Sequence, residues 1–443
     1  MRVVIVGAGE VGSSIAASLC ADHEVVVVDR DSDRVESLTY SLDVLPVEGD
    51  GASLETLTEA SVGDADMVIA CTDNDETNIV ACGTVKTISE AFTIARVRNT
   101  KYLDTWNNAE GALGVDLMVG TNLLTARSIS RVIGLPAAHD VDAFADGLVR
   151  MAEFTIHDDS PVAGTTVAAA DRFDSLTFAA IIRDDDVVIP RGDTCLLDGD
   201  RVVVIGSPES VGDFATTMRG EIGSIDDVLI VGGSDIGRQT ADVLSEEGIG
   251  TRLIEPDPEH ARVLAEALPD TTVLNADPTD QEFLEREHIA EVDVVVAALG
   301  NDEQNLLAGL LAKRMGADRA IAVVEEGSYI DLFEAVGIDV AVNPRKAIAE
   351  EITRFTRERH AENVAMLESD RAEVLEIEVD EASVLTGRPI AESIGDLPDG
   401  VVIGAITRDG AFVQPRGDTV IERGDHIVVF ADTDVLDDAM TDL

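Results

Sequence analysis

The chain has 443 residues, too many for one ordinary domain and suited to two to four. Asp and Glu number 87 against 32 Lys and Arg, so the formal net charge is -55. The acidic residues are spread along the whole chain, which indicates adaptation to a cytoplasm of molar salt, where a Debye length of about 3 Å screens self-repulsion. Such a composition argues against a nucleic-acid partner, because a phosphate backbone is bound by a basic stripe.

The cysteines and the apolar runs indicate the cellular compartment of the protein. Cys20, Cys71, Cys82 and Cys195 form no CxxC pair and have no histidine at ligand spacing, which predicts reduced thiols without a disulfide or a metal site. The chain enters a strand pattern at once, so we expect no signal peptide. No apolar run approaches the roughly 18 residues of a membrane span. We therefore expect a cytoplasmic protein.

A long internal repeat organises the chain. "IVGAGEVGSSIAASL" near the start matches "IVGGSDIGRQTADVL" near the middle, with Gly7 over Gly232, an offset of 225 residues. "CTDNDETN" likewise matches "ALGNDEQN", and "PRGDTCLLDGDRVVVIG" matches "PRGDTVIERGDHIVVFA", at nearly the same offset. The sequence therefore contains two copies of one unit, far longer than the repeat of a solenoid or propeller.

In chain order, each copy first alternates Val- and Ile-rich runs with helical patterns. These runs are "VVIVGAG", "EVVVVDRD", "MVIACT" and "TIARV" in copy one, and "VLIVGG", "TRLIEPD", "VDVVVAAL" and "AIAVV" in copy two. They predict parallel strands buried on both faces of a doubly wound sheet. The later part of each copy has period-two alternation and Asp-Gly turns, which predicts a small antiparallel sheet. In copy one, a helix over 121–136 that Pro136 ends joins the two parts.

We therefore predict an α/β protein with two tandem Rossmann-like doubly wound parallel sheets, each followed by a small α+β domain with an antiparallel sheet. The predicted domains are 1–136, 138–222, 226–346 and 362–443. The repeated "PRGD", at 190–193 and 415–418, is interpreted as a hairpin turn rather than as a ligand site.

A complete dinucleotide-binding fingerprint stands at the start of copy one. Gly7, Gly9 and Gly12 form GxGxxG between a strand pattern and a helix pattern, so the N–H groups of the helix start can face a pyrophosphate. Asp29 ends the next strand, where an acid binds the adenosine ribose. This acid disfavours the 2′-phosphate of NADP, whereas NAD, NADH, ATP and ADP share the same ribose and stay open. The alternative for Asp29 is a solvated acid at a strand end.

Further positions are expected along the same cleft of copy one. Asp50 follows the third strand, and Thr72 and Asp73 open "TDNDETN" after the fourth. Arg96 ends the fifth strand, where it can reach a phosphate. Thr72 and Asp73 also have a structural alternative, because either can be the N-cap of a capping box with an acid three residues on.

Copy two keeps only part of this pattern. Ser234 stands where the middle glycine should be, and we expect its side chain to narrow the approach of a phosphate and to resist a positive φ. Glu255 takes the place of Asp29, whereas Val323 takes the place of Arg96. Nucleotide binding and a purely architectural role are both open for copy two. The two copies are expected to differ in what they do.

No catalytic constellation is expected beside either fingerprint. The histidines are His23, His139, His157, His260, His288, His360 and His426. None of them is expected at a strand end of either α/β domain beside a partner, and the sequence contains no GxSxG, HExxH or P-loop motif. We therefore predict binding without turnover, no metal site and no catalytic residue. An NAD-dependent oxidoreductase with an unknown substrate is the alternative.

The series GAGEVG, VVVD, GDGAS, TDNDETN and ARV, its internal duplicate and the two PRGD segments resemble the TrkA family of regulatory subunits of Trk potassium uptake. The Rossmann-like parts are similar to RCK (regulator of K⁺ conductance) N-terminal domains, and the antiparallel parts to RCK C-terminal domains. The resemblance implies binding of NAD(H), with ATP or ADP as alternatives. It also implies a homo-oligomeric ring, as a tetramer, that attaches peripherally to a membrane-embedded Trk K⁺ translocating subunit.

The resemblance also implies which residues bind the nucleotide. They are Gly7, Ala8, Gly9, Glu10, Val11, Gly12, Asp29, Asp50, Thr72, Asp73 and Arg96 in copy one, and Gly232, Gly233, Ser234, Asp235, Ile236 and Glu255 in copy two. The expected mechanism is that one nucleotide state favours one closure of the α/β domains, which gates the K⁺ subunit. A nucleotide-sensing module for a different transporter is a further alternative.

Overall fold

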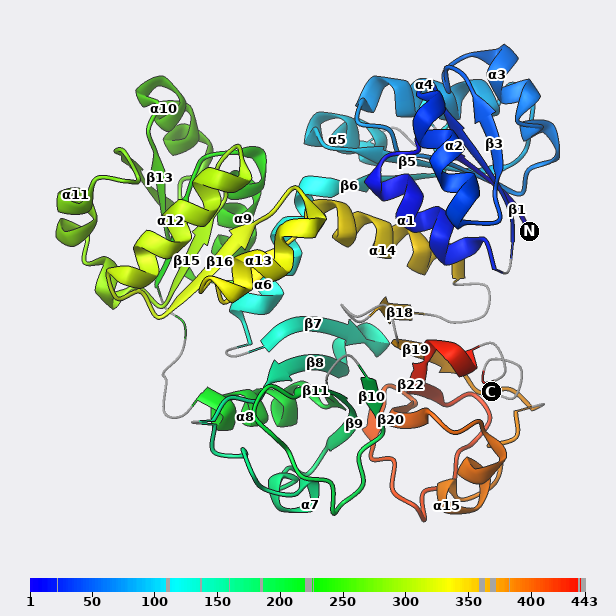
Figure 1. Ribbon diagram of the computed structural model, residues 1–443, viewed down its shortest axis with the longest axis vertical. Coiled ribbons are helices and arrows are strands. Elements are labelled where there is room, and N and C mark those ends of the chain that lie inside the picture. The colour runs from blue at the N-terminus through cyan, green and yellow to red at the C-terminus, as the bar shows by residue number, and fades with distance from the viewer. Residues whose placement is uncertain are drawn as a thin grey trace. The chain divides into compact units, whose positions relative to one another are not determined.

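The computed structural model describes residues 1–21, 23–108, 112–135, 138–158, 160–183, 186–219, 225, 227–357, 363–366, 372–381, 383–436 and 439. The chain divides into two compact units, Met1–Ser130 with Ile225–Thr353 and Arg131–Ser224 with Arg354–Leu443. Domains that alternate along the chain are thus paired by kind, Rossmann-like with Rossmann-like and antiparallel with antiparallel (Figure 1). Pro136, His360 and the predicted domain edges at 136, 222, 226, 362 and 443 lie outside the described residues.

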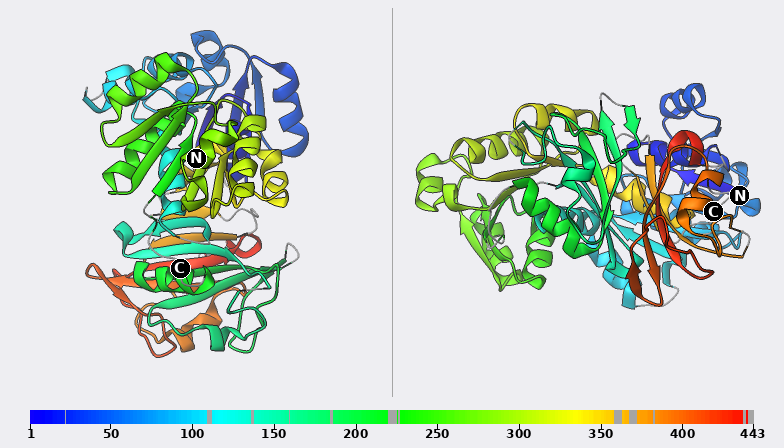
Figure 2. Two further views of the ribbon diagram at one scale, coloured as in Figure 1. Left: turned by 90° about the vertical axis from the view of Figure 1, so that its left-hand side faces the viewer. Right: turned by 90° about the horizontal axis from the view of Figure 1, so that it is seen from below.

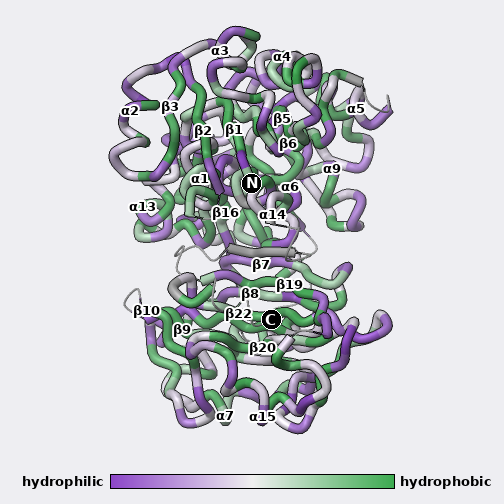
Figure 3. The backbone as a smooth tube through the Cα atoms, turned by 90° about the vertical axis from the view of Figure 1, so that its right-hand side faces the viewer, coloured by the Kyte–Doolittle hydropathy of each residue, from purple (hydrophilic) through white to green (hydrophobic). Residues whose placement is uncertain are grey.

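The first Rossmann-like domain contains a six-stranded parallel sheet in the order β3-β2-β1-β4-β5-β6. Its strands are β1 (Arg2–Val6), β2 (Glu24–Asp29), β3 (Leu45–Glu48), β4 (Met67–Ala70), β5 (Phe92–Val97) and β6 (Leu117–Gly120). The Val-rich strands β1, β2 and β4 are buried almost throughout, as an inner parallel strand requires. The interior parts of β1 and β2 are hydrophobic in Figure 3.

Helices cover both faces of this sheet (Figure 1). They are α1 (Glu10–Leu19), α2 (Ser32–Ser41), α3 (Leu54–Glu59), α4 (Asp75–Val85) and α5 (Thr100–Asn108). Helix α6 (Thr121–Ile133) leads out of the domain. It ends three residues before Pro136, so the helix predicted over 121–136 is shorter than expected.

The second Rossmann-like domain repeats this arrangement in the order β14-β13-β12-β15-β16-β17. Its strands are β12 (Asp227–Val231), β13 (Gly250–Glu255), β14 (Thr271–Asn275), β15 (Val294–Ala297), β16 (Arg319–Val323) and β17 (Val340–Val342). Its helices are α9 (Asp235–Glu246), α10 (Pro258–Ala267), α11 (Gln281–Arg286), α12 (Asp302–Arg314), α13 (Ile330–Ala335) and α14 (Pro344–Arg357). The doubly wound sheets are confirmed, whereas the short sixth strands β6 and β17 were not predicted.

The second unit contains two five-stranded sheets, in the orders β10-β9-β11-β8-β7 and β18-β19-β22-β20-β21. The strands are β7 (Ala138–Phe144), β8 (Val149–Thr155), β9 (Leu176–Arg183), β10 (Asp186–Val188), β11 (Arg201–Gly206), β18 (Asn363–Met366), β19 (Ala372–Glu378), β20 (Val401–Arg408), β21 (Ala411–Val413) and β22 (His426–Asp432). The helices are α7 (Val167–Ala170), α8 (Pro208–Arg219) and α15 (Ile390–Ser393). All described pairings in these sheets are antiparallel, as predicted.

The two antiparallel sheets pack on each other through one shared core. Phe144 and Met151 from the first sheet and Val374 and Phe430 from the second lie in the same buried cluster. The sheets are seen from two further directions in Figure 2. This shared core makes the two antiparallel domains one unit although the second Rossmann-like domain separates them in sequence.

The PRGD segments form turns, but these are not hairpin turns. Thr194 N donates to Arg191 O at 2.9 Å, and Thr419 N donates to Arg416 O at 2.9 Å. Strands β21 and β22, which flank the second turn, are not neighbours, because β20 lies between them. The expected Asp-Gly hairpin is found instead between β20 and β21, where Asp409 and Gly410 both have positive φ.

Candidate functional site

A cleft of about 700 Å³ lies at the carboxyl ends of the strands of the first Rossmann-like sheet. Residues after β1 to β5 line it, so it covers the switch point between β1 and β4, where open α/β sheets bind ligands. The predicted residues that line this first cleft are Gly7, Ala8, Gly9, Glu10, Val11, Asp29, Asp50, Thr72, Asp73 and Arg96. Its volume is in the range typical of small-molecule sites.

The glycine loop brings the N-terminus of α1 to the cleft. Gly7 has φ 117°, which an L side chain rarely adopts. Gly12 does not line the cleft; a Cβ there would lie 1.8 Å from Gly7 O, so this glycine permits α1 to approach the loop. Gly9 is the N-cap of α1 and supplies no side-chain hydrogen bond to it. The first turn of α1 therefore has N–H groups available to an anion.

Asp29 and Asp50 stand on the β2–β3 side of the cleft. Asp29 Oδ2 accepts a hydrogen bond from Ala8 N at 2.7 Å, and Oδ1 accepts one from Asp31 N at 2.9 Å. Each carboxylate oxygen has a second lone pair, so Asp29 can hold the loop and still accept from a ribose hydroxyl. Asp50 Oδ1 accepts from Ala52 N at 3.0 Å and shapes its own turn.

The segment after β4 is mainly structural. Thr72 Oγ1 donates to Asn78 Oδ1 at 2.6 Å, and Asn78 Nδ2 donates to Arg96 O at 2.9 Å. The N-cap of α4 is Asn74, which accepts from Thr77 N at 2.7 Å, so the alternative that Thr72 or Asp73 caps this helix is wrong. Asn78 is fully buried and fastens β4 to β5. The sequence analysis did not identify Asn78. The repeat could have revealed it, because Asn305 stands at the same position in copy two and makes the same hydrogen bond.

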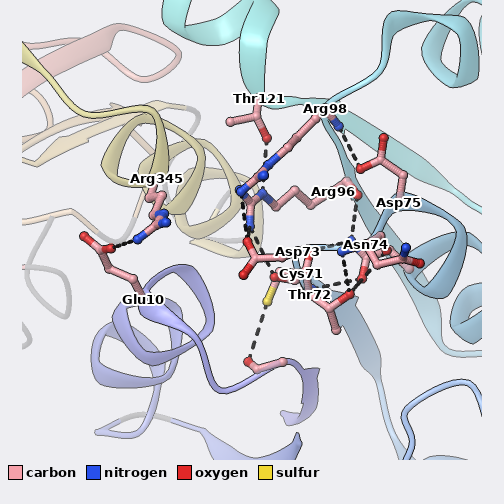
Figure 4. A network of polar contacts seen from close by, with 12 residues as sticks. Glu10, Cys71, Thr72, Asp73, Asn74, Asp75, Arg96, Arg98, Thr121 and Arg345 are labelled. Carbon is pink, nitrogen blue, oxygen red and sulfur yellow. Dashed lines mark hydrogen bonds and ion pairs between the residues drawn. The ribbon is translucent and has the colours of Figure 1, made fainter. Parts of the chain in front are cut away.

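Arg96 occupies the base of the cleft on the β4–β5 side (Figure 4). It is only 3% exposed, and its Nε donates to Thr121 Oγ1 at 3.2 Å. Burial lowers its pKa, with Arg98 as the next cause. Asp73 Oδ1 lies 3.6 Å from Arg96 Nη1 and 2.9 Å from Arg98 Nη2, so one exposed acid serves both arginines.

Arg345 enters the first cleft from the second Rossmann-like domain, at the start of α14. It forms an ion pair with Glu10, the first residue of α1 (Figure 4). Gly327 N donates to the same carboxylate at 3.3 Å. Sequence analysis did not find Arg345, because 335 residues separate it from Glu10 and no local motif marks it. It also missed Arg30 and Arg34, which line the cleft beyond Asp29.

The corresponding loop of copy two, residues 232–237, is called here the second glycine loop. Gly232 has φ 110°, and a Cβ at Gly237 would lie 2.1 Å from Gly232 O, as in copy one. Ser234 has φ -58°, so this position makes no demand for the positive φ that a serine was expected to resist. Its hydroxyl accepts from Gly237 N at 3.2 Å and donates to Ala298 O at 2.7 Å. Ser234 therefore caps α9 where Gly9 leaves α1 uncapped.

Glu255 is engaged by the second glycine loop itself. Its Oε2 accepts from Gly233 N at 3.0 Å and its Oε1 from Asp257 N at 2.9 Å, and the residue is 7% exposed. A Cβ at Gly233 would lie 2.3 Å from Leu264 Cδ1 and 2.7 Å from Glu255 Oε2, so the packing requires a glycine where copy one has Ala8. His260 lies on α10 rather than at a strand end, and its Nδ1 is 3.4 Å from Glu255.

The arginines that line the first cleft can be compared with the residues at the equivalent positions of the other copy. None of the equivalents of Arg34, Arg96 and Arg345 is an arginine or a lysine, and one is a histidine. Arg34 and His260 are each the third residue after an N-cap aspartate. Arg96 and Val323 are equivalent, because the carbonyl oxygen of each accepts a hydrogen bond from an asparagine, Asn78 in copy one and Asn305 in copy two. Arg345 and Asn122 are each the second residue of a helix. Asp235 and Ile236 stand at the start of α9, as Glu10 and Val11 do in α1.

The fold and the first cleft define a protein with paired Rossmann-like domains, of which one presents an anion-binding helix N-terminus. The TrkA-N domain matches residues 3–120 and 228–344, and the TrkA-C domain matches residues 151–219 and 374–442. The chain therefore belongs to the TrkA family, which confirms the resemblance.

Named relatives and solved structures agree with this assignment. The chain is 37% identical over 439 residues to Trk system potassium uptake protein TrkA homolog 1 of Methanosarcina mazei, covering 97% of both chains. It is 33% identical over 444 residues to Trk system potassium uptake protein TrkA of Haemophilus influenzae, covering 97% of this chain and 95% of that protein. The GsuK RCK domain has TM-score 0.60 at 19% identity, covering 99% of this chain and 95% of that one. The GsuK channel bound to NAD has TM-score 0.60 at 19% identity, with 99% and 79% covered.

Proposed function

We propose that this chain is the regulatory subunit of a Trk-type potassium uptake system and that it binds an adenine nucleotide in the first cleft. NAD(H) is the first candidate ligand, and ATP or ADP is the alternative. The observation that supports binding most strongly is the uncapped N-terminus of α1 at Gly9, which lines a cleft together with arginines. In a chain of net charge -55, a cleft with Arg30, Arg34 and Arg96 is an exceptional place for an anion.

The β2 side of the cleft supports an unmodified adenosine ribose. Asp29 lines the cleft with a carboxylate that accepts hydrogen bonds and repels a 2′-phosphate. NADP is therefore disfavoured. The GsuK channel was solved bound to NAD, so the shared fold is able to accommodate a dinucleotide.

A regulator fits the first cleft better than an oxidoreductase. Within the described part of the chain, no histidine lines the cleft. Burial raises the pKa of the Cys71 thiol to about 12, so this lining residue is a poor nucleophile or acid–base group at neutral pH. We therefore infer binding without turnover, with no catalytic residue.

The second glycine loop is proposed to be architectural. The Ser234 hydroxyl already satisfies Gly237 N, and Glu255 is buried on Gly233. A phosphate would have to replace the hydrogen bond between Ser234 and Gly237 N, and Glu255 is only 7% exposed, so a ribose has little access to its carboxylate. Gly232, Gly233, Ser234, Asp235, Ile236 and Glu255 are therefore proposed to hold the domain together rather than to bind a nucleotide.

The partner of the subunit is proposed to be a membrane-embedded K⁺ translocating subunit. Among the described residues, no helix is both long and apolar enough to cross a bilayer, so the proposed attachment to the membrane is peripheral. Closing or opening a gate by population shift requires about 5.5 kcal/mol of differential binding. Several sites with coupling of about 1–3 kcal/mol each reach this sum, which favours a ring of copies, as a tetramer. We also propose that the chain has the four predicted domain ranges and that it is adapted to molar salt.

Calorimetry in concentrated KCl with NADH, NAD, ATP and ADP tests this function. Asp29→Asn is expected to weaken each bound ligand by roughly tenfold, because a charged acceptor of the ribose is lost. Glu255→Gln is the matched control and should leave the affinities within about twofold of the wild type, since Glu255 lies in the second Rossmann-like domain and is proposed to contact no nucleotide. No heat with any ligand, or turnover of NADH with a candidate ketone, would overturn the proposal.

A further inference from the structure

We propose that the Glu10–Arg345 ion pair selects a ligand whose second half is uncharged, such as a dinucleotide, over a nucleoside triphosphate. This inference rests on the proposed function, because it concerns the ligand of the same cleft. It assigns specificity to a residue pair that spans the two Rossmann-like domains, with Glu10 in the first and Arg345 in the second.

Sheet order determines which end of the cleft the pair faces. The strand ends follow one another as β3, β2, β1, β4 and β5, with Asp29 after β2, Gly7 after β1 and Arg96 at β5. An adenosine ribose on Asp29 and a pyrophosphate on the α1 N-terminus place the remaining half of the ligand on the β4–β5 side. Arg345 lines the same cleft as Asp73 and Arg96, and the charge of Asp73 raises the pKa of Arg345, so Arg345 lies near that side.

The cations on this side are already matched by acids. Arg96 and Arg98 both pair with Asp73. Arg345 pairs with Glu10 and has Glu325 3.9 Å from its Nη2. Partial burial lowers the pKa of Arg345, but Glu10, Glu325 and Asp73 raise it overall. The uncharged dihydronicotinamide riboside of NADH leaves these pairs intact, whereas a terminal phosphate must displace Glu10 from Arg345.

Glu10 is not free to move away from an incoming phosphate. Gly327 N donates to Glu10 Oε1 at 3.3 Å, and a Cβ at Gly327 would lie 2.6 Å from that oxygen, so the backbone approaches closely. A displaced Glu10 would remain in the cleft lining as a negative charge beside the phosphate. Like charges at such range cost binding energy in the partly desolvated cleft.

The repeat shows that the fold does not require this pair. Asp235 stands at the position of Glu10 in copy two, and Asn122 at the position of Arg345. Asn122 Nδ2 donates to Arg98 O at 3.0 Å instead of meeting an acid. The ion pair is thus specific to the cleft that has an uncapped helix, which indicates a role toward its ligand.

Calorimetry with NADH, ADP and ATP on the full chain tests the inference through the ratio of ATP to NADH affinity. Glu10→Gln frees Arg345 and removes the like charge, so ATP affinity should rise roughly tenfold while NADH affinity changes less than about twofold. Arg345→Gln leaves Glu10 unpaired, so ATP affinity should fall roughly tenfold. The double variant should restore the wild-type ratio. Arg262→Gln removes an exposed cation on α10 and is the matched control.

Salt separates this charge effect from a structural one. The gain of Glu10→Gln for ATP should shrink between 0.1 and 1 M KCl, as the Debye length falls from about 10 to about 3 Å. An unchanged ATP-to-NADH ratio in both single variants, with ligands still bound, would overturn this inference and leave the proposed function standing. If the wild type binds none of the three ligands, the proposed function itself fails.

Discussion

The first cleft and the second glycine loop begin from the same backbone and end in different chemistry. Gly7 and Gly232 have φ 117° and 110°, and Gly12 and Gly237 both allow a helix to approach the loop. The helix N-terminus is then left open by Gly9 in one copy and closed by Ser234 in the other. One hydroxyl thus satisfies an N–H group of α9 whose counterpart in α1 has no side-chain cap.

The same contrast extends to the acid after the second strand. Asp29 and Glu255 both accept from the glycine loop, but a Cβ at Gly233 would lie 2.3 Å from Leu264 Cδ1 and 2.7 Å from Glu255 Oε2. The acid proposed to bind a ribose and the acid proposed to anchor the loop therefore differ by one methylene. On this proposal, the same fold serves as a binding site in one copy and as a scaffold in the other.

The largest expected effect is on the free energy of unfolding, at the helix-packing glycine that both copies share. Gly12→Ala and Gly237→Ala each place a Cβ about 2 Å from a backbone oxygen, so each should lower the free energy of unfolding by about 3 kcal/mol or more. Thermal unfolding followed by circular dichroism measures both. Gly63→Ala, with nothing within 4 Å of the added Cβ, is the control. A loss in only one copy would show that the two loops are not equivalent.

Arg96→Val gives the first cleft the side chain that copy two has at Val323. Nucleotide affinity should fall roughly tenfold, because the cleft loses a buried cation whose charge favours the pyrophosphate. Val323 is as buried as Arg96, at 3% exposed, so a valine suits a position of this burial and the chain should remain folded. Calorimetry with NADH measures the loss, with Arg262→Gln as the control. An affinity equal to that of the wild type would mean that Arg96 serves only Cys71, Asp73 and Thr121.

Sequence patterns were sufficient for most of the fold. The Val-rich runs predict β1, β2, β4 and β5 because an inner parallel strand is apolar on both faces. Strands β6 and β17 were missed because four and three residues are too few to show a period. The positive φ of the motif lies at Gly232, whereas Ser234 at the middle position has an ordinary φ, so a serine is tolerated there without strain.

The site was predictable only where its residues follow strand ends. Asp29, Thr72, Asp73 and Arg96 all line the cleft because parallel strands end at the same edge. Arg345 could not be predicted from the sequence. It lies 335 residues from Glu10 and lines the cleft only because the two Rossmann-like domains pack together. Thr72 was assigned to the ligand, yet its hydroxyl is engaged by Asn78. Local spacing does not reveal which polar groups the fold uses internally.

Gly9→Ser transplants the cap of copy two into copy one. A Cβ at Gly9 meets nothing closer than Arg34 Nη1 at 3.7 Å, so the substitution is sterically allowed. The hydroxyl should cap α1 and compete with the phosphate, which lowers NADH affinity roughly tenfold. Gly9→Ala adds the Cβ without the hydroxyl and separates the two effects in calorimetry. Equal losses in both variants would assign the effect to bulk and contradict the capping account.

The smallest effect is expected from the reverse change in copy two. Ser234→Ala removes the acceptor of Gly237 N and the donor to Ala298 O, which should lower the free energy of unfolding by about 1 kcal/mol. Because the second glycine loop is proposed to bind no nucleotide, the same variant should leave NADH affinity and stoichiometry unchanged. Ser234→Gly opens the helix N-terminus further and restores the GxGxxG pattern. If either variant gains a second nucleotide per chain, the hydroxyl alone excludes the ligand; if neither does, the missing arginine at Val323 and the anchored Glu255 are the stronger barriers.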